Sequence, residues 1–217
     1  MPQELSSLTW AFAKAASPRL ALPGAGAPSP PRVLREDLSP QPASNDDQAL
    51  ATASIEGGGF TSAGAVGEVA RMLESRPQEL SNTSWSVAKL EIFDQPLLDA
   101  ISSQSLPLIS EFAPQNLGNT AWAFSKCGVR DLPLLAALSA AARRTQKDLH
   151  PQGLTNLAWA WSALSLLDMP LLAALSAESL PTLSEFNPQN LANTAWSFAT
   201  IAVSDGPLLD AIASSAL

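Results

Sequence analysis

The sequence predicts an all-α protein: a right-handed α-solenoid of helix-turn-helix repeats, preceded by a disordered, Pro-rich N-terminal insertion. Three markers recur in one register with a period of 37 residues: a Pro-Gln pair, a tryptophan and an aspartate. Their positions are Pro77, Pro114, Pro151 and Pro188; Trp85, Trp122, Trp159 and Trp196; Asp94, Asp131, Asp168 and Asp205. Repeats of this length cannot bury an apolar face alone, so they stack on one another, which favours a solenoid.

The chain divides into four parts. The stretch MPQELSSLTWAFAK has the Pro-to-Trp spacing of the repeats and predicts an isolated partial repeat helix. The next part holds seven prolines between Pro18 and Pro42, so it reads as a low-complexity linker. Gln48 stands where a tryptophan is expected, so the following half repeat is eroded. The predicted parts are residues 1–17, 18–59, 60–76 and 77–217, and the last holds units 77–113, 114–150, 151–187 and 188–217.

Each unit predicts two helices. Helix A opens at the proline of the Pro-Gln pair, where the missing N–H costs nothing, and runs for about 13 residues. Helix B follows an aspartate that caps it and carries a proline in its first turn, as in DLPLLAAL. Pro107 and Pro181 fall within helix B, so we expect a kink or a short break there.

Helix A has two distinct faces on a helical wheel. In the unit 114–150, Leu117, Ala121 and Phe124 form an apolar face that predicts the core. The opposite face carries amides, an indole and often a lysine at its end, so stacked units would align them in rows. The members of these rows are Gln78, Asn82, Trp85 and Lys89; Gln115, Asn119, Trp122 and Lys126; Gln152, Asn156 and Trp159; Gln189, Asn193 and Trp196.

Two interpretations of these rows stay open. Recurrent tryptophans and asparagines commonly fill the seams between helices. Alternatively, amides pair with base edges and indoles stack on bases, as in helical repeats that read single-stranded RNA one base per unit. Positions that change between units would then carry a code, or they drift on a solvated face. These positions are Glu79, Asn116, Gly153 and Asn190, and Ser81, Gly118, Thr155 and Ala192.

Composition limits the classes of function. The net charge of −8 argues against nucleic-acid binding by overall charge, so phosphate contact would need a local cluster such as Arg143, Arg144 and Lys147. With one cysteine, Cys127, and one histidine, His150, the chain lacks ligands for a finger-type zinc site. No segment has the length and apolarity to cross a membrane. We predict no catalytic site, metal or cofactor.

The PQNLANTAWSFA-like first helices, the D-x-PLL turns and the EF before the next PQ resemble octotricopeptide repeats. The resemblance covers residues 77–217 well and residues 2–14 in part. It implies an organellar protein of plastids or mitochondria that binds single-stranded RNA in transcript processing, stability or translation. The layout is also similar to that of proteins with RAP and FAST-kinase domains, although no RAP domain is visible here. Under this resemblance the candidate RNA-binding residues are the rows given above together with Arg143 and Arg144.

A protein-binding scaffold of the armadillo type is the alternative. Such arrays also use ladders of asparagine and tryptophan, and an acidic scaffold suits a basic partner. The expected partners are therefore single-stranded RNA or other proteins, with neither DNA nor membrane expected.

Overall fold

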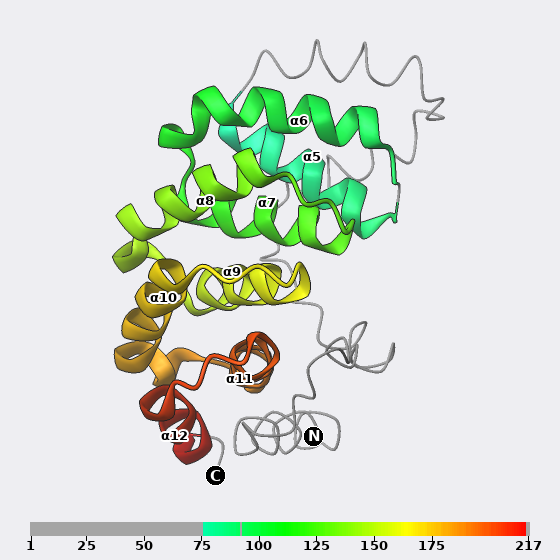
Figure 1. Ribbon diagram of the computed structural model, residues 1–217. Helices are drawn as coiled ribbons and strands as arrows, with labels where there is room; N and C mark the ends of the chain where they lie inside the picture. The colour runs from blue at the N-terminus through cyan, green and yellow to red at the C-terminus, as the bar shows by residue number, and fades with distance from the viewer. Residues whose placement is uncertain (1–75, 92, 216–217) are drawn as a thin grey trace.

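The computed structural model describes residues 76–91 and 93–215, and every regular element in these ranges is helical (Figure 1). The described part holds eight α-helices, α5 to α12, and three 3₁₀-helices, η1 to η3. The all-α prediction is therefore confirmed for these residues. The predicted partial repeat helix, the linker and nearly all of the half repeat lie outside them.

The first helix of each unit begins at its Pro-Gln pair, as predicted. These helices are 13 or 14 residues long, with proline at the first helical position. They are α5 (Pro77–Lys89), α7 (Pro114–Lys126), α9 (Pro151–Ala163) and α11 (Pro188–Ile201). In two of them the asparagine two residues after the proline reaches back, since the Asn116 and Asn190 side chains accept the backbone N–H of Ala113 and Asn187. This contact satisfies a backbone N–H just before the first turn.

The second helix of each unit is capped by the aspartate of the turn. These helices are α6 (Gln95–Leu108), α8 (Leu132–Arg144), α10 (Met169–Thr182) and α12 (Gly206–Ser215). Each aspartate Oδ1 accepts the backbone N–H of the leucine three residues later, at 3.0 to 3.1 Å. The predicted capping role of Asp94, Asp131, Asp168 and Asp205 is thus confirmed, and such a cap is worth about 1 kcal/mol.

The second helices end early, but proline is not the cause. Pro107 and Pro181 are the penultimate residues of α6 and α10, and a 3₁₀-helix follows each: η1 (Ile109–Glu111) and η3 (Leu183–Glu185). The unit with Arg144 in this slot also ends its helix there and continues into η2 (Gln146–Asp148). The break therefore belongs to the repeat geometry, and the prolines are tolerated because the helix is about to end.

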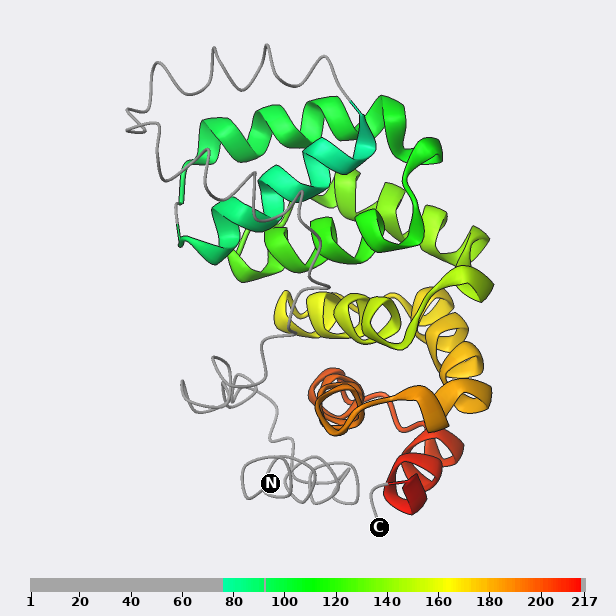
Figure 2. The same ribbon diagram turned by 180° about the vertical axis from the view of Figure 1, so that it is seen from behind.

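The helices form two layers. Each first helix packs on the next first helix, from α5 through α7 and α9 to α11. The second helices contact one another in the same order, from α6 to α12, and each also contacts the first helix of its own unit. Figures 1 and 2 show the units stacked in chain order from α5 and α6 to α11 and α12. A continuous apolar core runs between the layers, and it includes the predicted core residues Leu117, Ala121 and Phe124.

Each first helix is followed, within two residues, by a residue with left-handed backbone. These residues are Glu91, Gly128, Ser165 and Ala202, with φ between 54° and 70°. At the end of α7 the Gly128 N–H donates to the carbonyl of Ser125, and the Val129 N–H donates to that of Phe124. This is the Schellman arrangement, which satisfies the last carbonyls of a helix. No helix within the described residues has the length and apolarity that a membrane crossing requires.

Candidate nucleic-acid interface

The asparagines and tryptophans of the predicted rows lie in the interior. They form what we call the Asn/Trp row: Asn82, Trp85, Asn119, Trp122, Asn156, Trp159, Asn193 and Trp196. No member is more than 8% exposed. Of the two interpretations left open by the sequence, the one in which these side chains fill the seams between helices agrees with the burial of these eight residues. A first helix in the middle of the stack has a neighbour on both sides as well as a second helix behind it, so few of its positions face solvent.

The tryptophans pack from unit to unit. The rings of Trp85 and Trp122 have centroids 6.3 Å apart and planes 29° apart. Offset stacking of this kind adds about 0.5–1.5 kcal/mol to the burial of the rings themselves. The structural interpretation of the recurrent tryptophan, a side chain that fills the seam between first helices, accounts for this placement.

The Asn/Trp row nevertheless holds buried polar atoms with no hydrogen-bond partner in the part of the chain that the structure describes. They include the indole N–H of Trp122, Trp159 and Trp196. Amide atoms of Asn119, Asn156 and Asn193 are also buried without a hydrogen-bond partner among the described residues. An unsatisfied buried group costs about 1–3 kcal/mol, so a row of them is the most demanding polar feature of the fold.

The glutamines and lysines of the predicted rows are more accessible than the Asn/Trp row. Gln78, Gln115 and Lys89 are exposed, whereas Gln152, Gln189 and Lys126 are half-buried. Lys126 contacts the Glu91 carboxylate of the preceding unit at 3.8 Å. The structure thus separates the candidate residues into an interior Asn/Trp row and accessible side chains at the two ends of the first helices.

The positions proposed to carry a code have structural roles. At the third helical position, Asn116 and Asn190 cap their helices as described, and Glu79 Oε2 accepts the Arg76 N–H at 3.4 Å. The set Ser81, Gly118, Thr155 and Ala192 is buried. Gly118 faces Gly153 so closely that a Cβ on it would lie 3.4 Å from the Gly153 Cα. Caps at Glu79, Asn116 and Asn190 and the burial of the second set therefore give most of these positions structural roles.

A group of basic side chains lies where α8 passes into α9. Arg143 and Arg144 end α8, Lys147 lies in η2 and His150 precedes α9, and all four are exposed. We call these four residues the basic corner. No ion pair with another described residue engages them, although Asp148 is their neighbour in sequence. The sequence analysis named the two arginines and the lysine as a cluster, but it did not include His150.

The start of α9 differs from the other first-helix starts. Its third residue is Gly153, which has no side chain to reach back to the residue before the helix, and the His150 side chain makes no cap. The amide nitrogen of Gln152 is buried and has no hydrogen-bond partner among the described residues. A helix N-terminus carries partial positive charge, so this start adds N–H donors to the cations of the basic corner.

Cys127 has no catalytic environment. Burial raises the pKa of its thiol to about 11, although the nearby Lys126 ammonium lowers it. The thiol is therefore protonated at neutral pH, and a protonated thiol is a poor nucleophile.

The sequence of residues 86–217 matches the family described as RNA-editing substrate-binding complex 6 protein. This match spans more than half of the chain. The chain belongs to this family.

Membership in the RNA-editing substrate-binding complex 6 family connects the chain with RNA, which agrees with the coarse prediction of an RNA-related repeat protein. The matched region begins within α5 and includes the basic corner and most of the Asn/Trp row. The resemblance to octotricopeptide repeats and to RAP-containing proteins stays a prediction. No curated protein matches the chain.

Proposed function

We propose that the chain is a single-stranded RNA-binding repeat protein that contacts the RNA backbone at the basic corner. On this proposal the stacked helices are a segment of a right-handed α-solenoid, and the protein acts by binding and not by catalysis. Family membership supports the connection with RNA. The observation that supports this site best is the basic corner itself. Its exposed side chains form no ion pair with the other described residues.

The chemistry of the corner suits phosphate. Arginine forms bidentate contacts with phosphate oxygens, and Arg143 and Arg144 offer two such groups in the last turn of α8. Lys147 adds a point charge, and the start of α9 adds backbone N–H groups beside it. In the third and fourth units, residues 151–217, the sequence has no lysine or arginine. The corner is therefore the last place along the array where a phosphate would meet cations.

The Asn/Trp row has a different task in this proposal. Because its side chains are buried, we assign to it the spacing and rigidity of the first-helix layer. We assign the contacts with bases to accessible amides such as Gln78 and Gln115. Since the changing positions are caps and packing residues, binding should depend mainly on the phosphate backbone and only modestly on base sequence.

Binding of the full chain to labelled single-stranded RNA tests the proposal, with affinity measured over a series of salt concentrations. We expect Arg144→Glu to weaken binding and to reduce the salt slope by about 0.7 for each phosphate that the variant no longer neutralises. Arg130→Glu is the matched control, since Arg130 is exposed and lies at the opposite end of the helices, in the turn after α7. Equal losses of affinity in the two variants, or no RNA retained at low salt, would contradict the assignment to the basic corner.

We further propose that the protein acts in a plastid or mitochondrion, in RNA processing, stability or translation. This part rests on the resemblance to octotricopeptide repeats. Fluorescence microscopy of the tagged full-length protein in its native cell tests it, and a purely nuclear or cytosolic signal would refute it.

A further inference from the structure

Large apolar side chains are exposed at the turns between the first and second helices. Phe93, Leu132, Leu167 and Met169 are each more than half exposed. Phe93 and Leu167 lie in turns, and Leu132 and Met169 are the first residues of α8 and α10. We call this side of the array the turn edge. Exposed apolar side chains therefore occur at three successive turns along this edge.

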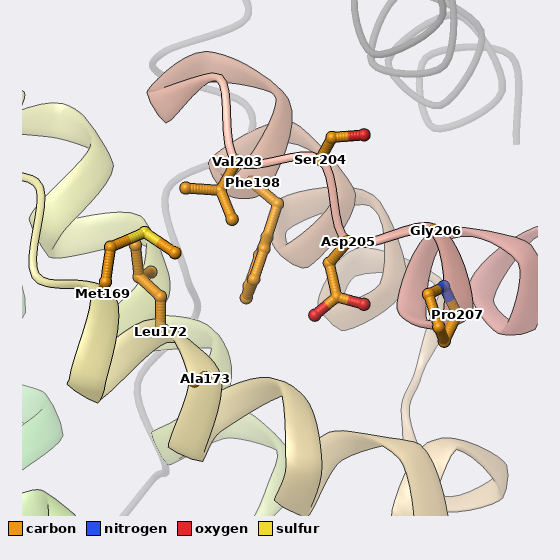
Figure 3. A pocket seen from close by; sticks show the side chains of 9 residues that line it. All are labelled: Met169, Leu172, Ala173, Phe198, Val203, Ser204, Asp205, Gly206 and Pro207. Carbon is orange, nitrogen blue, oxygen red and sulfur yellow. The ribbon is translucent and has the colours of Figure 1, made fainter.

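A cavity opens on the turn edge at the turn between α11 and α12. This cavity, which we call the hollow, has a volume of about 220 Å³ and lies between the start of α10, the end of α11 and the start of α12. Figure 3 shows Met169, Leu172, Phe198 and Val203 around it, and Asp205, whose carboxylate caps α12, also lines it. The lining is therefore largely apolar, with a carboxylate at its border.

Small residues border the hollow on one side. Ser204 and Gly206 border it. The equivalent residues one repeat earlier are Leu167 and Met169, which are large. A Cβ built on Gly206 would meet nothing within 4 Å, so the space in front of it is open. The hollow of the fourth unit therefore has small residues on one side, where the preceding unit has large ones.

The surroundings of the hollow are acidic. Residues 151–217 carry five aspartates and glutamates and no lysine or arginine. Asp205 lines the hollow, Asp168 precedes α10 and the exposed Asp210 lies on α12. Such a surface repels phosphates and attracts cations, so it favours a basic partner over RNA. A second copy of this half would bring the same negative charge and is disfavoured for the same reason.

We propose that the hollow is a docking site for a protein segment that presents one apolar side chain flanked by lysine or arginine. The apolar side chain enters between α10 and the turn, where the flexible Met169 adapts to its shape. The flanking cations lie near the carboxylates of the fourth unit. This site is separate from the basic corner, which lies at the opposite ends of the helices.

Fluorescence anisotropy with the full chain tests the site. The probe is a short labelled peptide of leucine and lysine, compared with one in which serine replaces leucine and one in which glutamate replaces lysine. We expect binding of the leucine–lysine peptide only. The double variant Ser204→Leu with Gly206→Met, which copies the residues of the preceding unit, should weaken that binding by about tenfold or more because it fills the hollow.

Ser184→Leu is the matched control, since Ser184 is exposed and lies in η3 at the other ends of the helices. It should bind the peptide as the unchanged chain does, and thermal unfolding checks that both variants are folded. Unchanged peptide affinity in the filled double variant would overturn the proposal. Equal binding of the serine–lysine peptide would overturn it too, and so would a loss of RNA binding in the double variant.

Discussion

Four equivalent residues adopt left-handed backbone, yet only one of them is glycine. A residue with a Cβ pays about 1 kcal/mol or more in this conformation, whereas glycine does not. Ala202 has φ of 61° at the end of α11, and Gly128 has φ of 70° at the end of α7. The same backbone therefore costs more at Ala202 than at Gly128.

This difference predicts opposite effects of two exchanges. Ala202→Gly should raise the free energy of unfolding by up to about 1 kcal/mol, and Gly128→Ala should lower it by a similar amount. A Cβ on Gly128 would meet nothing within 4 Å, so backbone strain is the expected source of the loss. Urea denaturation monitored by circular dichroism measures both changes.

Ala136→Gly is the control for the alanine exchange, because Ala136 is exposed within α8. There glycine should destabilise by about 1 kcal/mol, since it loses helix propensity without relieving strain. If Ala202→Gly also destabilised the chain, the left-handed end of α11 would not persist in solution.

The sequence predicted the starts of the helices and the length of the first helices, but not the left-handed residues that follow them. Proline followed by glutamine, and aspartate before a leucine pair, are local signals with a direct mechanism, so both kinds of start were predicted correctly. The left-handed ends gave almost no signal, because Glu91, Ser165 and Ala202 stand where glycine is usual. Among the four equivalent positions, only Gly128 is the residue type that is usual for a left-handed helix end.

The faces of the first helices were harder to predict than their bounds. A helical wheel shows which residues share a face, but not how many neighbours surround the helix. The apolar face of α7 was predicted correctly, whereas the sequence left open whether Asn119 and Trp122 fill a seam or face solvent, and both are buried. Their burial depends on contacts of α7 with both α5 and α9, which only the stacked array provides.

Substitution of Trp159 tests whether the indoles of the Asn/Trp row have a structural role. Trp159 is 2% exposed, and its N–H has no hydrogen-bond partner among the described residues. Trp159→Phe removes this N–H and leaves a small cavity, so we expect a decrease of no more than about 2 kcal/mol in unfolding free energy, whereas Trp159→Ala should cost about 3–5 kcal/mol. Chemical denaturation of the two variants measures the difference.

RNA binding by the same variant separates the two interpretations of the row. A structural indole predicts unchanged RNA affinity in folded Trp159→Phe, because phenylalanine still fills most of the seam. A folded variant that loses RNA affinity would show instead that the indole N–H takes part in recognition. The row would then have to open when RNA binds.

Charge is unevenly distributed along the array. All six lysines and arginines after Pro77 lie in the first two units, and the last two units carry only carboxylates. The two units with cations end at the basic corner, and the acidic units carry the hollow of the turn edge. We therefore expect RNA and a basic protein segment to bind different parts of the stack, without competing for the same surface.

Hydrogen exchange of the full chain, alone and with saturating single-stranded RNA, tests this division. RNA should slow amide exchange at the end of α8, in η2 and at the start of α9, where phosphate contacts would cover the backbone. The start of α12 should exchange at the same rate in both states, because its carboxylates repel phosphate. Raising the salt concentration should remove the protection, since the contacts are electrostatic. Protection strongest around α12, or spread evenly over all four units, would mean that charge does not decide where RNA binds and that another surface carries the contact.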